Sequence, residues 1–329
     1  MSLRCTAAFA ALLLAASTAY SEDNSHLGNH LSEAVSVGYV MIPFTVLGSQ
    51  GNPITDLREG EVKLEVDGAP VARDLFEKSH DAPVSFTILL DGSGSMALAG
   101  KMDSARAAVD ALIAHRRPGD DFALYVFDQD EAHEVVAFTE DPRAIARALK
   151  TIEPFGKTAF FDALSTMPER SRLGRNPTRA IILLSDGIDN ASKLTKADLA
   201  QQLQGIAIPI YPLGLREKGE QTDVAKDAGS DLALLDDVAS LTGGRLFVGN
   251  QPEQLGAAVE ALEKNLRAQY LIGFTPTGRG AVKYRHISLR LAGRVHSVRV
   301  RAGYLGTEPP GLAAASSREK SKRSERKGS

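Results

Sequence analysis

Cysteine and long apolar runs are scarce in this sequence, and their scarcity limits what the protein can be. Cys5 is the only cysteine among 329 residues, which excludes an intramolecular disulfide and a cysteine-based metal cluster. The one long apolar stretch, residues 7–16, follows a short basic start ending at Arg4 and precedes small residues around Ala19. This order predicts a secretory signal peptide over residues 1–21. The apolar stretch is too short for a membrane span, which needs roughly 20 apolar residues. We therefore expect an exported protein, periplasmic or extracellular, with no membrane span.

An excess of positive charge is also missing outside the two ends of the chain. The formal net charge of −3 includes +1 from Arg4 and +4 from the tail that begins at Ser316, so the body carries about −8. An acidic body is evidence against nucleic acid as a partner. The polar, basic composition toward the end predicts a disordered tail over residues 307–329. Attraction of this tail to an anionic surface is an alternative role.

Residues 83–267 alternate strand patterns with helical patterns. Two sequence signals mark the N-termini of predicted helices. Asp141 is an N-cap residue followed by Pro142 at the first helical position, and Thr195 to Asp198 resembles a capping box. Alternation of this kind predicts an α/β fold, a Rossmann-like doubly wound sheet that is mostly parallel with helices on both faces. Strands are predicted at residues 86–90, 122–127, 134–139, 179–184, 206–213 and 246–248.

The regions on either side of this domain carry β patterns instead. Residues 33–80 contain two such strands, and residues 268–306 contain three more. So few strands are marginal on their own. We therefore predict that both regions join in one small β module and that the α/β domain is inserted between them, since the two ends of a chain often lie close together on one domain.

Carboxylates and hydroxyls gather where two of the predicted buried strands end. The run at residues 86–90 ends at Asp91, and Ser93 and Ser95 follow it in a glycine-rich turn; the run at residues 179–184 leads to Asp186. Right-handed crossovers bring the ends of parallel strands to one edge of the sheet, where open α/β folds bind ligands. Hard oxygen ligands of this kind suit Mg²⁺, Mn²⁺ or Ca²⁺ rather than zinc or copper.

These residues resemble the von Willebrand factor type A domain family. Asp91-Gly-Ser93-Gly-Ser95 matches its Asp-x-Ser-x-Ser signature, the loop at residues 156–163 looks like the one that brings its metal-binding threonine, Thr158, and residues 185–190 are similar to the loop with its last aspartate, Asp186. The resemblance covers roughly residues 83–267, and the flanking strands resemble a bacterial exported subgroup.

The resemblance implies a metal-ion-dependent adhesion site and a function in protein binding. The ion, Mg²⁺ with Mn²⁺ or Ca²⁺ as alternatives, would contact Ser93, Ser95 and Thr158, while Asp91 and Asp186 act directly or through water. The remaining coordination position would receive an acidic side chain of a protein partner in adhesion or assembly. We expect no catalytic residues and no organic cofactor.

Three further residues lie near this pattern in the sequence. Lys157 departs from the family, in which a small residue commonly precedes the threonine, and we expect its side chain to face solvent. Asp128 and Asp189 lie near the predicted edge by sequence. Acidic residues are common in such loops, so we do not include these two among the ligands.

Simpler explanations and enzymatic alternatives fit less of the pattern. A helix cap explains one hydroxyl, but not two serines with two aspartates. Thr151 stands where a phosphate-binding loop ending at Lys157 and Thr158 would need its first glycine. A magnesium-dependent phosphotransferase or hydrolase using Asp91 is the enzymatic alternative, although Ser93 stands where its second acid would be. A structural module with a vestigial site is the third possibility.

Overall fold

The computed structural model describes residues 39–49, 51–80, 82–217, 231–276, 282–291 and 297–307. The predicted signal peptide, residues 1–21, lies outside the described residues, and so does the predicted basic tail apart from its first residue. Among the described residues, none of the helices has the length and apolar content that crossing a membrane requires.

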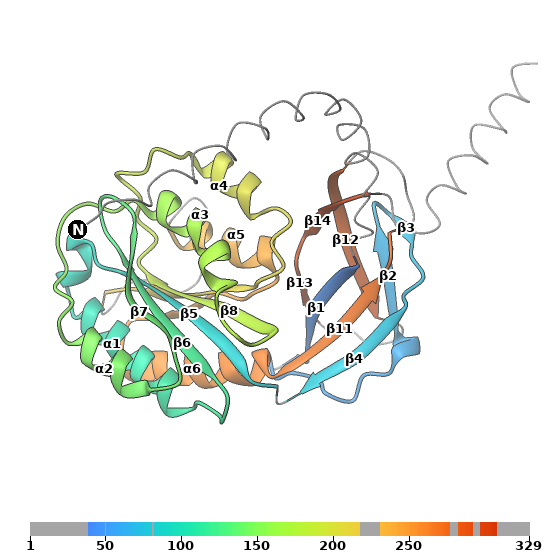
Figure 1. The fold of residues 1–329 in the computed structure, drawn as a ribbon, viewed down its shortest axis with the longest axis horizontal. Coiled ribbons are helices and arrows are strands. Elements are labelled where there is room, and N and C mark those ends of the chain that lie inside the picture. The colour runs from blue at the N-terminus through green and yellow to red at the C-terminus, as the bar shows by residue number, and fades with distance from the viewer. Residues whose placement is uncertain are drawn as a thin grey trace, which may run out of the picture. The chain divides into compact units, whose positions relative to one another are not determined.

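A six-stranded sheet forms the centre of the α/β domain, with the order β10-β9-β8-β5-β6-β7. Figure 1 labels four of its strands, β5 to β8. Neighbouring strands run parallel except β7, which pairs antiparallel with β6 at one edge. The predicted doubly wound, mostly parallel fold is therefore confirmed. The strands are β5 (Val84–Asp91), β6 (Asp121–Phe127), β7 (Ala132–Thr139), β8 (Thr178–Ser185), β9 (Ile210–Leu215) and β10 (Phe247–Gly249).

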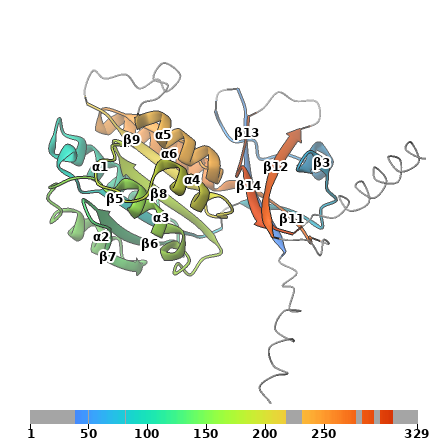
Figure 2. The same ribbon diagram turned by 90° about the horizontal axis from the view of Figure 1, so that it is seen from above.

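Helices cover both faces of this sheet (Figure 2). On one face lie α1 (Lys101–Ala114), α2 (Pro142–Leu149) and α6 (Pro252–Leu266), and on the other α3 (Phe160–Ser171), α4 (Lys196–Leu203) and α5 (Asp231–Thr242). Central strand β5 is buried along its whole length and alternates between the two apolar cores, with Ile88 in the first and Leu89 in the second. Because side chains of a strand alternate with a period of two, Asp91 projects on the same side as Leu89, toward α3.

Local sequence signals account for several element boundaries. The Asp141 carboxylate caps α2 by accepting a hydrogen bond from the Arg143 amide, and Pro142 occupies the first helical position. Thr195 and Asp198 form the predicted capping box of α4. The strand predicted from residue 206 begins only at Ile210. The turn that follows α4 occupies residues 204–205, and residues 206–209 are irregular backbone.

Strands from both ends of the chain pair with each other outside the α/β domain (Figure 1). They form two four-stranded antiparallel sheets, where the sequence predicted one module without specifying its layers. One sheet has the order β13 (Ser297–Val300), β1 (Val40–Leu47), β11 (Ala268–Phe274) and β4 (Leu75–His80); the other has the order β14 (Gly303–Gly306), β12 (Lys283–Leu291), β2 (Val62–Val66) and β3 (Ala69–Pro70). Side chains from both sheets, including Phe44, Tyr270 and Leu64, share one apolar core.

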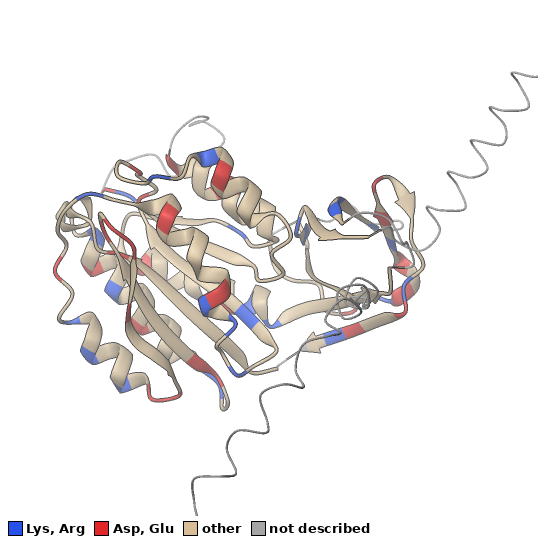
Figure 3. Ribbon diagram, turned by 45° about the horizontal axis from the view of Figure 1, so that its top comes forward, with Lys and Arg blue, Asp and Glu red and all other residues tan. Residues whose placement is uncertain are grey.

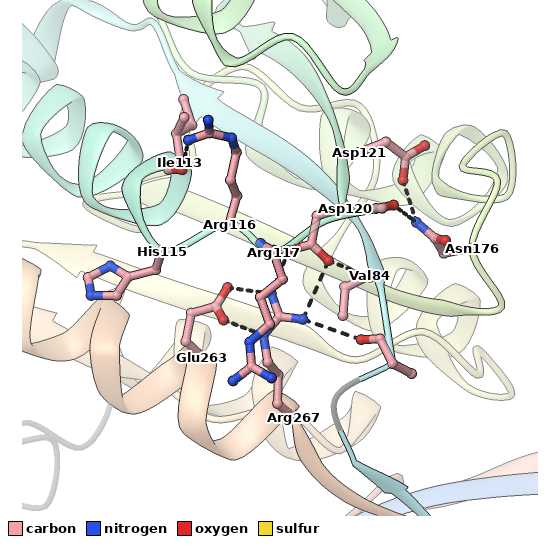
Figure 4. Close-up of polar contacts among 12 residues, drawn as sticks. Val84, Ile113, His115, Arg116, Arg117, Asp120, Asp121, Asn176, Glu263 and Arg267 are labelled. Atoms are coloured by element: carbon pink, nitrogen blue, oxygen red, sulfur yellow. Dashed lines mark hydrogen bonds and ion pairs between the residues drawn. The ribbon is translucent and has the colours of Figure 1, made fainter.

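A buried ionic network stands where the chain leaves the α/β domain (Figure 4). Arg267, which follows α6, donates to Asp120 Oδ2 over 2.6 Å and to Glu263 Oε2 over 2.6 Å. Arg267 also donates to the carbonyl of Ala82, and Asp120 accepts from the amide of Val84. The network thus joins the segment that enters the domain to the segment that leaves it.

Candidate metal centre

The candidate site lies between β5 and β8, the two neighbouring strands at which the order of the sheet reverses. From β5 the chain moves outward to β6 and β7, and it then returns to the other side of β5 to form β8, β9 and β10. Ligand sites in open α/β sheets form at such switch points, beyond the carboxyl ends of the strands. Asp91 is the last residue of β5, and Asp186 directly follows β8.

The Asp91 carboxylate is fully buried, and both of its oxygens accept hydrogen bonds. Oδ1 accepts from the Ser93 amide over 2.9 Å, and Oδ2 accepts from the Ser185 hydroxyl over 2.7 Å. Burial raises the pKa of Asp91 to about 6; the hydrogen bonds from Ser185 and Ser93 oppose that rise, and the nearby charge of Asp186 adds to it. A cation bound beside Asp91 would favour its ionised form.

Ser93 and Ser95 present their hydroxyls together just beyond Asp91. Their Oγ atoms lie 3.1 Å apart, and Ser93 precedes a short 3₁₀ helix, η2 (Gly94–Ala97). Ser93 does not act as a simple cap, since its side chain makes no capping hydrogen bond to this helix. At Gly92 a Cβ atom would lie 2.7 Å from Val126 Cγ1, so the turn needs glycine to pack this closely on β6.

The loop that carries Thr158 is docked onto this serine turn by backbone hydrogen bonds. The Phe155 amide donates to the Gly92 carbonyl over 2.8 Å, and the Gly94 amide donates to the Gly156 carbonyl over 3.0 Å. Gly156 has a φ of +84°, a conformation that favours glycine. Thr158 itself is buried.

The loop after β8 completes the enclosure through Asn190. The Asn190 Oδ1 atom accepts from the Thr158 amide over 2.8 Å, and the Asn190 amide donates to the Thr158 carbonyl over 3.0 Å. Ser185 bridges the same region, because its hydroxyl donates to Asp91 and accepts from the Gly187 amide over 3.0 Å. The three loops that carry the predicted ligands are therefore held together by hydrogen bonds.

Asp186 has a partner that the sequence analysis missed. Its Oδ1 accepts from the Ile188 amide over 3.3 Å, and its Oδ2 accepts from Lys101 Nζ over 3.1 Å. The Lys101 and Asp186 side chains are only 8% and 1% exposed. Buried lysines are rare unless they are paired. Lys101 could therefore be recognised as unusual only after the structure had shown that the start of α1 lies next to the serine turn.

The three residues held back from the ligand set have other surroundings. Lys157 is exposed, in agreement with the expectation that it faces solvent. Asp189 Oδ2 accepts from the Phe161 amide and from the Ser192 hydroxyl, which fixes the loop onto the start of α3. Asp128 Oδ1 accepts from the amide of Asp130 in its own exposed turn.

The donor set fits a hard divalent cation. Asp91, Ser93, Ser95, Thr158 and Asp186 offer carboxylate and hydroxyl oxygens, the ligand type that Mg²⁺ and Mn²⁺ prefer. Within the described part of the chain, no group of three or more His, Cys, Asp or Glu side chains could hold a metal ion. An ion at this site would thus depend on the hydroxyls as well as on the two carboxylates.

Comparison with known proteins finds similarity to one domain family. Residues 86–188 match the family model of the von Willebrand factor type A domain, and no curated protein matches the chain. Among solved structures, an aerotolerance-related membrane protein from Bacteroides fragilis is 19% identical, with 56% of this chain and 98% of that chain covered and a TM-score of 0.43.

Two further structures show a similarity of the same order. A von Willebrand factor type A protein from Catenulispora acidiphila is 16% identical, with 77% of this chain and 75% of that chain covered and a TM-score of 0.48. The conserved hypothetical protein BatB from Bacteroides thetaiotaomicron is 20% identical, with 55% and 98% covered and a TM-score of 0.42. Because these TM-scores are below 0.5, we rely only on the sequence match at residues 86–188.

Proposed function

Since residues 86–188 are a von Willebrand factor type A domain, we propose that this protein is an exported, metal-dependent protein-binding module. A divalent cation, Mg²⁺ in the first place, would be held by Asp91, Ser93, Ser95, Thr158 and Asp186. When bound, the ion supplies an electrophilic centre that accepts an acidic side chain of a protein partner. The role is adhesion or assembly rather than catalysis.

One observation carries this proposal: three loops from different parts of the chain are tied together around a set of hard oxygen donors. The ties are the hydrogen bonds of Phe155 to Gly92, Gly94 to Gly156, Thr158 to Asn190 and Ser185 to Asp91. A helix cap or a tight turn would not need this convergence. A preorganised set of oxygens is what a small cation requires of its binding site.

Exposed apolar side chains on the same loops support a protein partner. Leu98, which follows η2, is 57% exposed, and Phe155, on the loop that carries Thr158, is 79% exposed. Protein interfaces place apolar and aromatic side chains around their polar contacts. Acidic and basic residues are otherwise interspersed over the elements of the domain (Figure 3), which gives no support to a nucleic-acid partner.

Metal binding is tested first, by calorimetry with MnCl₂ and MgCl₂ on the full chain without its first 21 residues. We expect saturable binding that S93A and D186N abolish. The matched controls are S165A, which removes a hydroxyl bonded within α3, and D237N, which removes an exposed carboxylate paired with Lys196. Absence of metal binding in the unsubstituted protein would contradict the proposal and favour a vestigial site.

Partner capture is tested second, from the exported fraction of the source organism. We expect proteins that bind the immobilised chain in MgCl₂, elute with a chelator and fail to bind D186N. The enzymatic alternative gains no support from the geometry, because Asp91 is fully buried and both carboxylate oxygens accept hydrogen bonds. Phosphatase turnover that required both Mg²⁺ and Asp91 would nevertheless replace the binding proposal.

A further inference from the structure

Lys101 places a positive charge inside the candidate metal centre, directly on one of the predicted ligands. We infer that the Lys101 ammonium is a built-in counter-ion that competes with the metal: it neutralises Asp186 in the ion-free protein, and cation binding must displace it. This inference rests on the proposed metal binding and adds a residue that sets the affinity of the site. The Lys101 Nζ atom lies 3.1 Å from Asp186 Oδ2, and both side chains are buried.

The hydrogen bonds of Asp186 show why displacement is needed. Its Oδ1 already accepts from the Ile188 amide, so the oxygen that carries Lys101 is the one without a backbone partner. A dication that approached this oxygen with the ammonium still in place would be strongly repelled, because like charges interact strongly in a poorly solvated site. The ammonium and the ion therefore compete for the same carboxylate.

The backbone brings Lys101 to this place at a cost. Lys101 is the first residue of α1, where a positive charge opposes the helix dipole. The two residues before it, Ala99 and Gly100, have φ values of +50° and +73°, a conformation that is unfavourable for a residue other than glycine. Side chains lean toward the N-terminus of their helix, which directs Lys101 to the serine turn. Helix stability alone does not explain a lysine here.

A second carboxylate can receive the displaced ammonium. Glu217 Oε1 lies 3.9 Å from Lys101 Nζ, and its side chain is 42% exposed. Moving from Asp186 toward Glu217 would take the ammonium from a buried partner to one near solvent. The charges then balance: the metal faces Asp91 and Asp186, while Lys101 remains close enough to attract the acidic side chain of a partner.

Removing the charge tests the competition. Calorimetry with MnCl₂ alone compares the unsubstituted chain with K101M, K101R and K196M. Lys196 is a matched control because it is also the first residue of a helix and pairs with an aspartate, Asp237, but both side chains are more than half exposed. We expect K101M to bind Mn²⁺ about tenfold more tightly or better, equivalent to about 1.4 kcal/mol, and K101R and K196M to bind like the unsubstituted chain.

Thermal unfolding of the same variants gives a readout independent of heat signals. In chelator, K101M should unfold at a lower temperature than the unsubstituted chain, because Asp186 loses its cation. In MnCl₂ its melting temperature should rise by more than that of the unsubstituted chain. Equal or weaker Mn²⁺ binding by K101M would overturn the inference while leaving the proposed function intact, whereas absence of binding in every variant would remove the proposed function itself.

Amine labelling of the unsubstituted chain keeps the test independent of whether K101M folds. With an acetylating reagent, peptide mass spectrometry should find Lys101 protected in chelator and labelled severalfold faster in saturating MnCl₂. Lys196 provides the internal reference, since its exposed amine should react at the same rate in both conditions. Lys101 that stays equally protected with the metal bound would overturn the displacement.

Discussion

Replacing Asp91 with asparagine should stabilise the metal-free protein, although it removes a predicted metal ligand. Asp91 is fully buried, and burial raises its pKa to about 6 from 3.8, with the hydrogen bonds from Ser185 and Ser93 opposing the rise. The amide of D91N keeps an acceptor for the Ser93 amide. Its NH₂ group can donate to the Ser185 hydroxyl, which has a free lone pair besides the one that accepts from the Gly187 amide.

The magnitude follows from the difference between the folded and unfolded pKa. One pKa unit corresponds to about 1.4 kcal/mol, so ionising Asp91 in the folded protein costs about 3 kcal/mol of stability at neutral pH. Between pH 6 and pH 3.8 the folded state binds a proton that the unfolded state does not. The Asp91 contribution to stability is therefore lowest above pH 6, grows as the pH falls through 6, and is complete near pH 3.8.

Urea and thermal unfolding in chelator at pH 7.5 and pH 5 measure this directly. D91N should unfold roughly 5–10 °C above the unsubstituted chain at pH 7.5, and the gap should narrow at pH 5. D198N is a control for which the opposite change in stability is expected. Hydrogen bonds from Thr195 lower the pKa of Asp198, so loss of the Asp198 carboxylate should destabilise α4. In MgCl₂ the unsubstituted chain and D198N should gain stability, and D91N should not. A destabilised D91N at pH 7.5 in chelator would refute the reasoning.

Three further substitutions separate the site from its scaffold. S185A removes the hydroxyl that orients the buried carboxylate at the end of β5, so Mn²⁺ affinity by calorimetry should fall about tenfold, with a loss of about 1–3 kcal/mol in unfolding free energy. R267M leaves two buried carboxylates unpaired and should cost about 3–5 kcal/mol in urea unfolding, whereas R172M, in an exposed pair, should change little. F155S should weaken partner capture severalfold without altering Mn²⁺ affinity, while L173S, at an equally exposed apolar site, should leave capture unchanged.

The sequence was sufficient for the central sheet because its signals are local and agree with each other. The apolar run that became β5 ends at Asp91, and the run that became β8 ends at Ser185, directly before Asp186. The caps at Asp141 and Thr195 start their helices where predicted. Parallel topology then determines which strand ends share an edge, so Asp91 and Asp186 could be placed together without coordinates. Whether they hold a metal stays a prediction.

The layering of the β module could not be predicted, because it depends on pairing between distant residues. Val66 pairs with Ile287, and Phe44 pairs with Tyr270. The same alternation is compatible with one sheet or with two. The apolar core that the two sheets share determines that the strands form two sheets rather than one. That core is built from strands at both ends of the chain, so no single strand predicts it.

Lys101 shows a different limit on prediction from sequence. A lysine at the start of a helix is ordinarily a solvated surface residue, and nothing in its own neighbourhood in the sequence marks it otherwise. Its role arises because the turn at Ala99 and Gly100 bends α1 back toward the edge of the sheet, where Asp186 arrives from β8. The residues that donate oxygens could be recognised from their motif, but the residue that competes for those oxygens could not. A site that contains both oxygen-donating ligands and a competing lysine is expected to bind its metal ion weakly when no partner is present. It should bind the ion more tightly when the carboxylate of an acidic partner also interacts with the Lys101 ammonium.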